Sequence, residues 1–198
     1  MKKPILVIVI SFLFLSCSIP RYLLKNSEQT TGVDFSRGKW LLNFIEATSG
    51  TQNKLNILAL KDFSKILKER LVYIPNAKGL LLPKKIEINP SKLVLSNLKK
   101  GTDFDYFINI KASYVKSQLG IIDFTPHKYN KGGMNESEVI LEIYDLNTSE
   151  IIYSQCVVGF VTQVSDSDDV HFSKSNDDLI LGAYKKLIDD IEKKSIFN

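Results

Sequence analysis

Hydrophobic and polar residues alternate with a period of two over three long stretches, the pattern of a strand with one buried face. The first stretch, residues 104–116, places every second residue on one face, namely Tyr106, Ile108, Ile110, Ala112 and Tyr114. The other two, residues 137–146 and 151–164, flank a polar turn and predict a β-hairpin. The chain therefore contains three long predicted strands in succession.

A period of three to four residues marks two amphipathic helices. In residues 55–71, and again in residues 175–194, large apolar residues recur on one side and charged residues lie elsewhere. Asp177 and Asp178, near the start of the second helix, suit the positive end of its dipole. These two segments are the long helices of the predicted fold.

Shorter signals complete the series of elements. Residues 40–47 predict a first strand, and residues 72–74 and 80–82 predict two short ones. Asn89-Pro90 has the pattern of an N-cap followed by proline at the first helical position, which predicts a short helix ending at Lys100-Gly101. The resulting order predicts an α+β fold, in which a largely antiparallel sheet packs on about three helices and the last helix is C-terminal.

The chain divides into three parts by composition. Residues 39–198 are long enough to bury a core and are expected to form a single α+β domain. Residues 17–38 are polar and rich in turn-forming residues, which is typical of a tether, and its apolar Tyr22-Leu23-Leu24 could dock locally on the domain. Residues 1–16 are different again, because they are mostly apolar.

These first residues have the pattern of an export signal. Lys2 and Lys3 precede an apolar run at residues 5–15, and Cys17 follows it. As a helix the run would be about 16 Å long, at ~1.5 Å per residue. A bilayer hydrocarbon core is about 30 Å thick, so the run is too short to span it comfortably. Its length and flanks are those of a cleaved leader.

Phe14-Leu15-Ser16-Cys17 resembles the cleavage motif of a bacterial lipoprotein, although Phe14 stands where an aliphatic residue is usual. The resemblance implies that residues 1–16 are a signal peptide and that acyl chains such as palmitate modify Cys17. It also implies a membrane anchor in the cell envelope, facing the periplasm. Ser18 is not the aspartate associated with inner-membrane retention, so the resemblance favours the outer membrane. The alternative is an ordinary secretory leader cut near Ser16 or Ser18.

Three features of the domain also carry a resemblance: Phe104-Asp105-Tyr106-Phe107-Ile108 entering a strand after a helix, a hairpin from Ile143-Tyr144-Asp145 to Ser149-Glu150-Ile151-Ile152, and a closing helix from Leu179. Together they span residues 40–194. They are similar to the periplasmic domains of lipoproteins that activate peptidoglycan synthases, of the curli-secretion lipoprotein, and of the N-terminal domain of TolB. Ser149 departs from this pattern, because such hairpins usually carry glycine there.

Charge and cysteine content narrow the classes of function. The formal net charge is +4, and no block of lysine and arginine predicts a nucleic-acid partner. With Cys17 acylated, Cys156 has no partner for an internal disulfide. Cys156 lies in an apolar, alternating segment and is interpreted as a small buried hydrophobe. A nucleophilic thiol would instead need a histidine or cationic neighbour.

No catalytic, metal or nucleotide motif stands out, and we expect no cofactor. His127 and His171 are scattered, and with one free cysteine they do not predict a zinc site. Glu136, Glu138 and Glu142 share one strand face, and positions i and i+2 lie about 6.6 Å apart, a distance that permits glycoside hydrolysis. Three acids on one face of an antiparallel strand more often mark the face toward water.

Two further expectations concern contacts. Lys111, on a strand next to these acids, is expected to pair with them. The connection at residues 120–133 holds large apolar side chains that strand alternation does not explain. It is interpreted either as a lid over the core or as a patch that contacts a partner. The residues of that patch are Ile121, Ile122, Phe124, His127 and Tyr129.

The sequence as a whole predicts a lipid-anchored envelope module that binds an envelope protein and does not act as an enzyme. One alternative is a small envelope hydrolase that uses Glu136 and Glu138, or a site centred on His127. Another is a subunit of a secretion apparatus. An enzyme would show a deep pocket around Glu138 or His127, whereas a binding module would show an exposed apolar surface.

Overall fold

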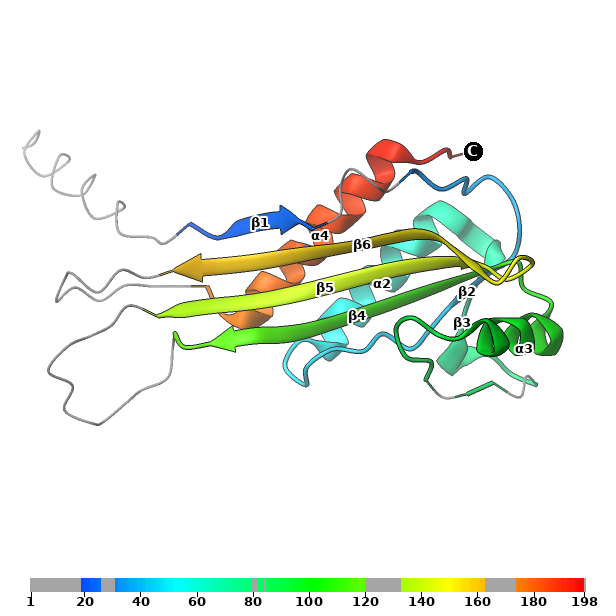
Figure 1. The fold of residues 1–198 in the computed structure, drawn as a ribbon, viewed down its shortest axis with the longest axis horizontal. Helices are drawn as coiled ribbons and strands as arrows, with labels where there is room; N and C mark the ends of the chain where they lie inside the picture. The colour runs from blue at the N-terminus through cyan, green and yellow to red at the C-terminus, as the bar shows by residue number, and fades with distance from the viewer. Residues whose placement is uncertain are drawn as a thin grey trace, which may run out of the picture.

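The computed structural model describes residues 19–25, 31–79, 82–83, 85–119, 133–162 and 174–197. Within them the chain forms a six-stranded sheet and three α-helices (Figure 1). The strands are β1 (Arg21–Leu24), β2 (Trp40–Leu42), β3 (Leu71–Tyr73), β4 (Tyr106–Ser117), β5 (Met134–Asp145) and β6 (Glu150–Thr162). The helices are α2 (Gln52–Leu67), α3 (Lys92–Thr102) and α4 (Asn176–Lys194), with 3-10 turns at Lys68–Arg70 and Ile74–Asn76.

The strands follow the order β1-β6-β5-β4-β2-β3 across the sheet. β4, β5 and β6 pair antiparallel, and β1 also pairs antiparallel with β6. β2 pairs parallel to both β3 and β4. Parallel neighbours need a crossover connection, which α2 supplies between β2 and β3. The structure confirms the predicted α+β fold, with a largely antiparallel sheet and a C-terminal last helix.

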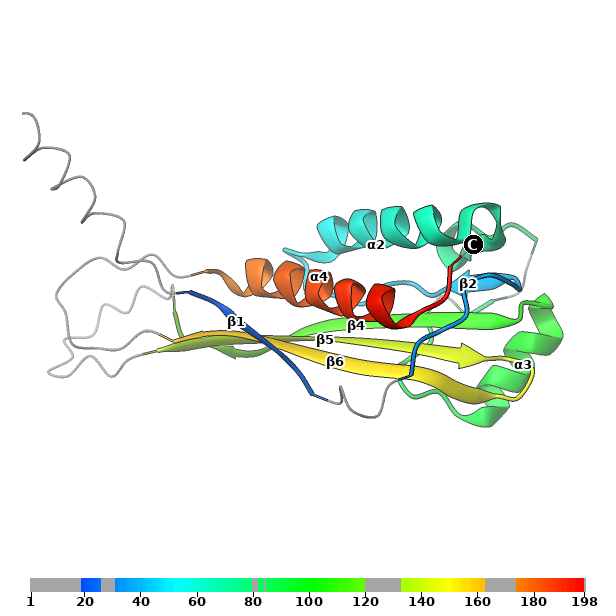
Figure 2. The ribbon, with the colours of Figure 1, turned by 90° about the horizontal axis from the view of Figure 1, so that it is seen from above.

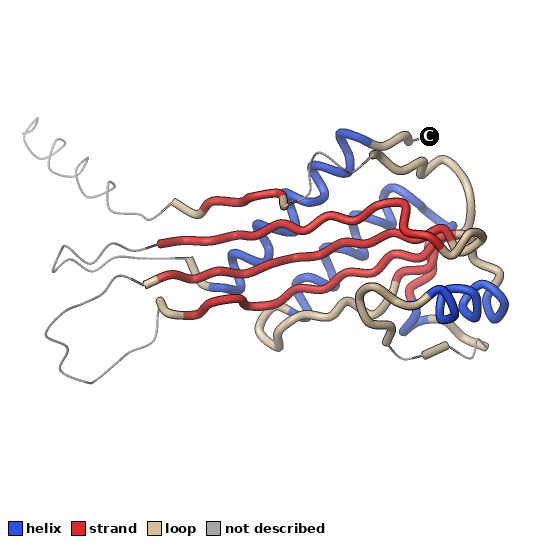
Figure 3. The backbone as a smooth tube through the Cα atoms, viewed as in Figure 1, coloured by secondary structure: helices blue, strands red, loops and turns tan. Residues whose placement is uncertain are grey.

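α2 and α4 cover one face of the sheet, and the larger core lies between them and the sheet (Figure 2). The long strands and these two helices run along one long axis of the molecule (Figure 3). From β4, Ile108, Ile110 and Ala112 enter this core, as their alternation predicted. The predicted period is confirmed, but of the predicted stripe Leu60, Phe63, Leu67 and Leu71 only Phe63 and Leu67 are fully buried. The helix residues buried in this core are Leu55, Ala59, Phe63, Leu67, Ile180, Ala183, Tyr184, Leu187, Ile188 and Ile191.

α3 covers the other face of the sheet, at one end. Its Leu95 and Leu98 form a second, smaller core with Leu41, Phe107 and Tyr144. In the described ranges no other helix lies on this face (Figure 2). None of the helices in those ranges has the length and apolar content that a membrane span requires.

α3 begins and ends later than predicted. Ser91, and not Asn89, caps its first turn, since the Ser91 Oγ accepts a hydrogen bond from the Val94 N–H at 3.4 Å. Gly101 lies inside the helix, and Asp103 ends it with a φ of 58°. Aspartate is one of the few residues that tolerate this left-handed conformation. The helix therefore does not need the glycine to terminate.

Two predicted strands are shorter than expected. β2 ends at Leu42, and Glu46 then forms only an isolated bridge to Lys111. Leu82 does not belong to a strand, so the predicted strand at residues 80–82 is wrong at that position. The rest of that segment, residues 80–81, lies outside the described residues.

Part of the predicted tether packs on the domain. β1 pairs with β6, from Arg21 opposite Phe160 to Leu24 opposite Val157. Val33 and Phe35 are buried in the larger core. The packed domain therefore begins before residue 39. The local docking of Tyr22-Leu23-Leu24 is confirmed, whereas the burial of Val33 and Phe35 was not predicted from the polar, turn-rich composition.

Candidate functional site

An apolar hollow lies beside β3, where the chain segments that follow β2 and β3 meet the connection to α3. We call it the β3 cavity, and its volume is about 460 Å³. It is lined by Phe44, Ile74, Pro75, Ala77, Leu82, Pro83 and Lys85. Lys85 is the only charged residue among the described residues of that lining. The cavity therefore fits a neutral apolar group better than a charged one.

A second apolar hollow, the α3 cavity, adjoins the first. Its volume is about 260 Å³. Leu82 and Pro83 line both cavities and form the wall between them. Its other lining residues are Ile86, Val94, Asn97, Leu98 and Gly101. At Gly101, a Cβ atom would meet nothing within 4 Å, so the missing side chain contributes open space.

Buried amide side chains hold the wall of these cavities on the sheet. The Asn43 Nδ2 donates to the Ile86 carbonyl at 2.6 Å, and the Asn109 Nδ2 donates to the Glu87 carbonyl at 2.9 Å. The Asn43 Nδ2 also donates to the Asn109 Oδ1 at 2.8 Å. Buried amides are costly to leave unpaired. These bonds therefore fix residues 86–87 against the sheet.

Glu142 belongs to the same set of contacts. It is only 6% exposed, and its Oε2 accepts hydrogen bonds from the Asn89 N–H at 2.9 Å and from the Tyr144 hydroxyl at 2.5 Å. Burial, together with this bond to a carboxylate, raises the pKa of Tyr144. The prediction that all three acids of β5 face water is wrong for Glu142. The α3 side of the molecule covers this end of the face.

Glu136 and Glu138 lie on alternate positions of that face, as predicted, but neither lines the β3 cavity or the α3 cavity. Glu138 accepts a hydrogen bond from the Ser113 hydroxyl at 3.1 Å and lies 3.9 Å from the Lys25 Nζ. Glu136 lies opposite Lys116 of β4. The β3 and α3 cavities are therefore not the pocket around Glu138 that the hydrolase alternative requires.

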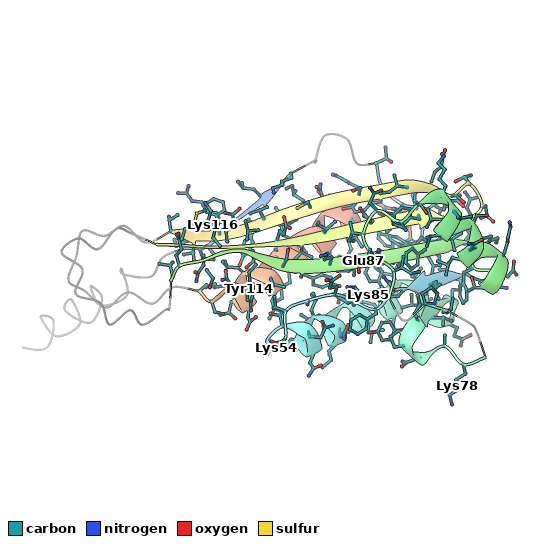
Figure 4. All side chains as sticks on the ribbon, turned by 60° about the horizontal axis from the view of Figure 1, so that its bottom comes forward. Lys54, Lys78, Lys85, Glu87, Tyr114 and Lys116 are labelled. Atoms are coloured by element: carbon teal, nitrogen blue, oxygen red, sulfur yellow. The ribbon has the colours of Figure 1, made fainter. Side chains whose placement is uncertain are left out.

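Lys111 does not pair with the β5 acids, contrary to the prediction. Its Nζ lies 3.5 Å from Glu46 and 4.0 Å from Glu87. Lys85 contacts the same two acids at 2.9 Å each, and Figure 4 shows Lys85 and Glu87 beside each other. The bonds to Glu87 and Glu46 raise the pKa of Lys85. Partial burial opposes ionisation of Glu46, but Lys85 and Lys111 outweigh it and lower the pKa of Glu46.

This cluster of two cations and two anions carries no net charge at neutral pH. The ammonium group at the rim of the β3 cavity is thus already engaged by carboxylates. An anionic ligand would have to displace them. The charge-balanced cluster around Lys85 and the apolar lining of the cavity therefore both favour an uncharged ligand.

Cys156 is half-buried on β6 and is a free thiol. It lies opposite Ile140 of β5. Burial, with a smaller effect from the Glu138 charge, raises the pKa of Cys156. A raised pKa lowers the fraction of reactive thiolate. The interpretation as a small buried hydrophobe is therefore right only in part, because Cys156 is half-buried and belongs to neither core.

Several predicted residues lie outside the described ranges. They are Cys17, His127, His171 and the loop residues Ile121, Ile122, Phe124 and Tyr129. Their lipid, metal or partner contacts stay predictions. Among the described residues, no group of three or more histidine, cysteine, aspartate or glutamate side chains could hold a metal ion.

The cavities are the feature that the sequence did not predict. The available signal was the segment from Ile74 to Lys85, in which apolar residues and prolines alternate with turn residues and no helical or strand period is present. Such a pattern predicts short strands and loops. Its packing against Phe44 and α3 depends on contacts distant in the sequence.

No protein-family model matches the chain, and no curated protein does. Among solved structures, it is similar to a PelC dodecamer from Paraburkholderia phytofirmans, with 10% identity, a TM-score of 0.46 and coverage of 87% of this chain and 97% of that one. It is also similar to the lipoprotein GNA1162 from Neisseria meningitidis, with 9% identity, a TM-score of 0.43 and coverage of 79% and 99%. 

A third similar structure is a putative neuraminyllactose-binding hemagglutinin homolog from Helicobacter pylori. It has 13% identity, a TM-score of 0.40 and coverage of 82% of this chain and 90% of that one. At such identities and TM-scores, these likenesses carry no inference about function.

Proposed function

We propose that this chain is a lipid-anchored module of the bacterial cell envelope that binds a protein partner and catalyses no reaction. Acylated Cys17 attaches it to the outer membrane, and the β3 and α3 cavities receive apolar side chains of the partner. The observation that carries the proposal is the pair of adjoining apolar cavities. The leader pattern of residues 1–17 supports the anchor.

The size and lining of the cavities support binding. Burial of one leucine-sized side chain contributes about 1.5–3 kcal/mol, and two cavities separated by Leu82 and Pro83 offer places for two such side chains. The neutral Lys85 cluster gives no preference for a charged ligand. A segment of a partner with two apolar side chains is therefore the kind of ligand that fits.

The surroundings of the candidate nucleophiles and acids support a role without catalysis. Glu142 is occupied in holding Asn89, and Glu138 contacts Ser113 and Lys25. Burial raises the pKa of the Cys156 thiol. The hydrolase and the secretion subunit remain alternatives, without a specific observation in their favour. The loop patch around Ile122 and Phe124 remains a second predicted contact.

The test fills the β3 cavity with a side chain. Ala77 lines the cavity, and the neighbouring Lys78 is exposed and does not line it (Figure 4). Ala77→Trp is expected to abolish chemical crosslinking to the partner in intact envelopes, with little change in melting temperature. Lys78→Trp adds the same side chain outside the cavity and is expected to retain the crosslinked product. Equal crosslinking by both variants would contradict binding in the cavity.

A further inference from the structure

β1 begins very close to the predicted lipid anchor. Arg21 is only four residues after Cys17. A chain extends at most ~3.5 Å per residue, so four residues reach about 14 Å. The inference below rests on the proposed lipid modification of Cys17. If Cys17 is held in the membrane, the start of β1 lies next to the membrane surface.

β1 is firmly attached to the rest of the domain. Its four residues pair with β6, and the Lys25 N–H continues the ladder by donating to the Cys156 carbonyl at 2.8 Å. The Tyr22 ring fills a slot above two glycines. A Cβ atom on Gly159 would lie 2.8 Å from the Tyr22 Cε1, and one on Gly182 would overlap the phenol. The anchor therefore connects to a fixed strand and not to a long free tether.

The start of β1 identifies one end of the molecule. The strand register places Arg21 opposite Phe160, Phe160 opposite Glu136, and Glu136 opposite Lys116. We call the end of the sheet marked by this row the anchor end. β4 and β6 end there, and β5 and α4 begin there, whereas α3 lies at the opposite end (Figures 1 and 2).

The charges of the anchor end suit a membrane surface. Arg21, Lys116 and Lys174 are exposed there, and none of them forms an ion pair within the described residues. Lys174 is placed at this end by its carbonyl, which accepts from the Asn135 Nδ2 at 3.3 Å. The acids of this end include Glu136 in the row and, at the start of α4, Asp177 and the exposed Asp178. Exposed cations next to a lipid anchor attract anionic headgroups.

We propose that the anchor end lies against the membrane and that β1 holds the domain upright on it. Ten residues of β4 separate Lys116 from Tyr106, which is about 33 Å at ~3.3 Å per residue. The α3 end is then held away from the bilayer, in the periplasm. The lipid surface is the partner of the anchor end, and the cavities lie among β3, α3 and the segment between them.

The test compares two labelled positions on vesicles of phosphatidylethanolamine and phosphatidylglycerol with nitroxide-labelled headgroups. In a Cys156→Ala background, Thr162→Cys places a fluorophore at the anchor end, and Thr148→Cys places it in the turn between β5 and β6 at the far end. Both side chains are exposed. The acylated full chain is expected to show several-fold stronger quenching at position 162 than at position 148.

Variants of β1 show whether the strand sets the orientation. Tyr22→Ala is expected to reduce the difference between the two positions, because a released β1 gives a longer tether. Leu23→Ala changes an exposed side chain of the same strand, 57% accessible, and is expected to keep the difference. In the protein with an unchanged β1, equal quenching at positions 162 and 148 would overturn the proposed orientation. If that protein still floats with the vesicles, the lipid anchor would stand. Failure to float would instead overturn the lipid anchor, and the orientation with it.

Discussion

Asp177 joins three elements at the point where α2 and α4 begin. Its Oδ1 accepts hydrogen bonds from the Thr51 hydroxyl and from the Tyr114 hydroxyl, the latter at 2.5 Å. These bonds to Thr51 and Tyr114 lower the pKa of Asp177. Burial, and then the bond to this carboxylate, raise the pKa of Tyr114. A single side chain thus links α4 to β4 and to the N-terminal end of α2.

This contact makes stability depend on pH in a defined direction. Because the folded pKa of Asp177 lies below its ordinary value of 3.8, its contribution is fully present above that value and is lost as the pH falls through the folded pKa. Asp177→Asn is expected to lower the free energy of unfolding by about 1–2 kcal/mol at neutral pH. It should also flatten the loss of stability in acid, measured by urea denaturation.

Asp178→Asn is the matched control for this prediction. Asp178 is exposed and bonds to Ser175 of its own helix start. It should leave the acid dependence close to that of wild type. If Asp177→Asn lost stability in acid as steeply as wild type does, the assigned role of Asp177 would be wrong.

The sequence located Asp177 correctly but not its partners. It predicted a helix start that suits a carboxylate, and the structure confirms that α4 begins there. Thr51 and Tyr114 are 126 and 63 residues away in the chain. A helix dipole is a local property and can be read from a few residues. A bond between distant elements depends on how the elements pack.

Among the elements, α3 and α4 each contain one glycine in opposite surroundings. A Cβ atom on Gly101 of α3 would meet nothing within 4 Å, whereas one on Gly182 of α4 would overlap Tyr22 of β1. Glycine in a helix interior is less favourable than alanine. Only the position facing β1 has a structural reason to be glycine.

Gly101→Ala is expected to raise the free energy of unfolding by roughly 0.5–1 kcal/mol, the usual effect of this substitution inside a helix. Gly182→Ala is expected to displace β1 and lower stability, although the gain in helix propensity is the same as for Gly101→Ala. Limited proteolysis of residues 19–25, alongside urea denaturation, measures both effects. In a Tyr22→Ala background the clash is absent, so Gly182→Ala should no longer destabilise. Equal effects of Gly101→Ala and Gly182→Ala on stability would contradict the close packing of Tyr22 against Gly182.

The elements that the sequence predicted best are those with long periodic patterns. β4, β5, β6, α2 and α4 appear close to their predicted positions because their buried faces repeat over many residues. β1 is only four residues long, and the sequence indicated that Tyr22-Leu23-Leu24 could dock but not that this segment pairs with β6 as a strand. The cavities depend on prolines and apolar residues without a period. Their wall is fixed by Asn43 and Asn109, whose burial follows only from the assembled fold.

At the scale of the whole molecule, the long axis separates two surfaces. The anchor end carries exposed cations and the start of β1, and the far end carries α3 (Figure 1). The two cavities lie among β3, α3 and the segment between them. The proposed binding surface would then be available to a periplasmic partner while the lipid keeps the chain in the membrane.

The lipid on Cys17 is the premise that connects these two ends, and intact-mass measurement of the protein extracted from its own membranes tests it directly. We expect a wild-type chain that begins at Cys17 and carries acyl groups, and a Cys17→Ala chain without them. Several buried acyl chains make attachment effectively permanent, whereas one would be marginal. A wild-type chain that begins at Ser18 or later and carries no lipid would contradict the account.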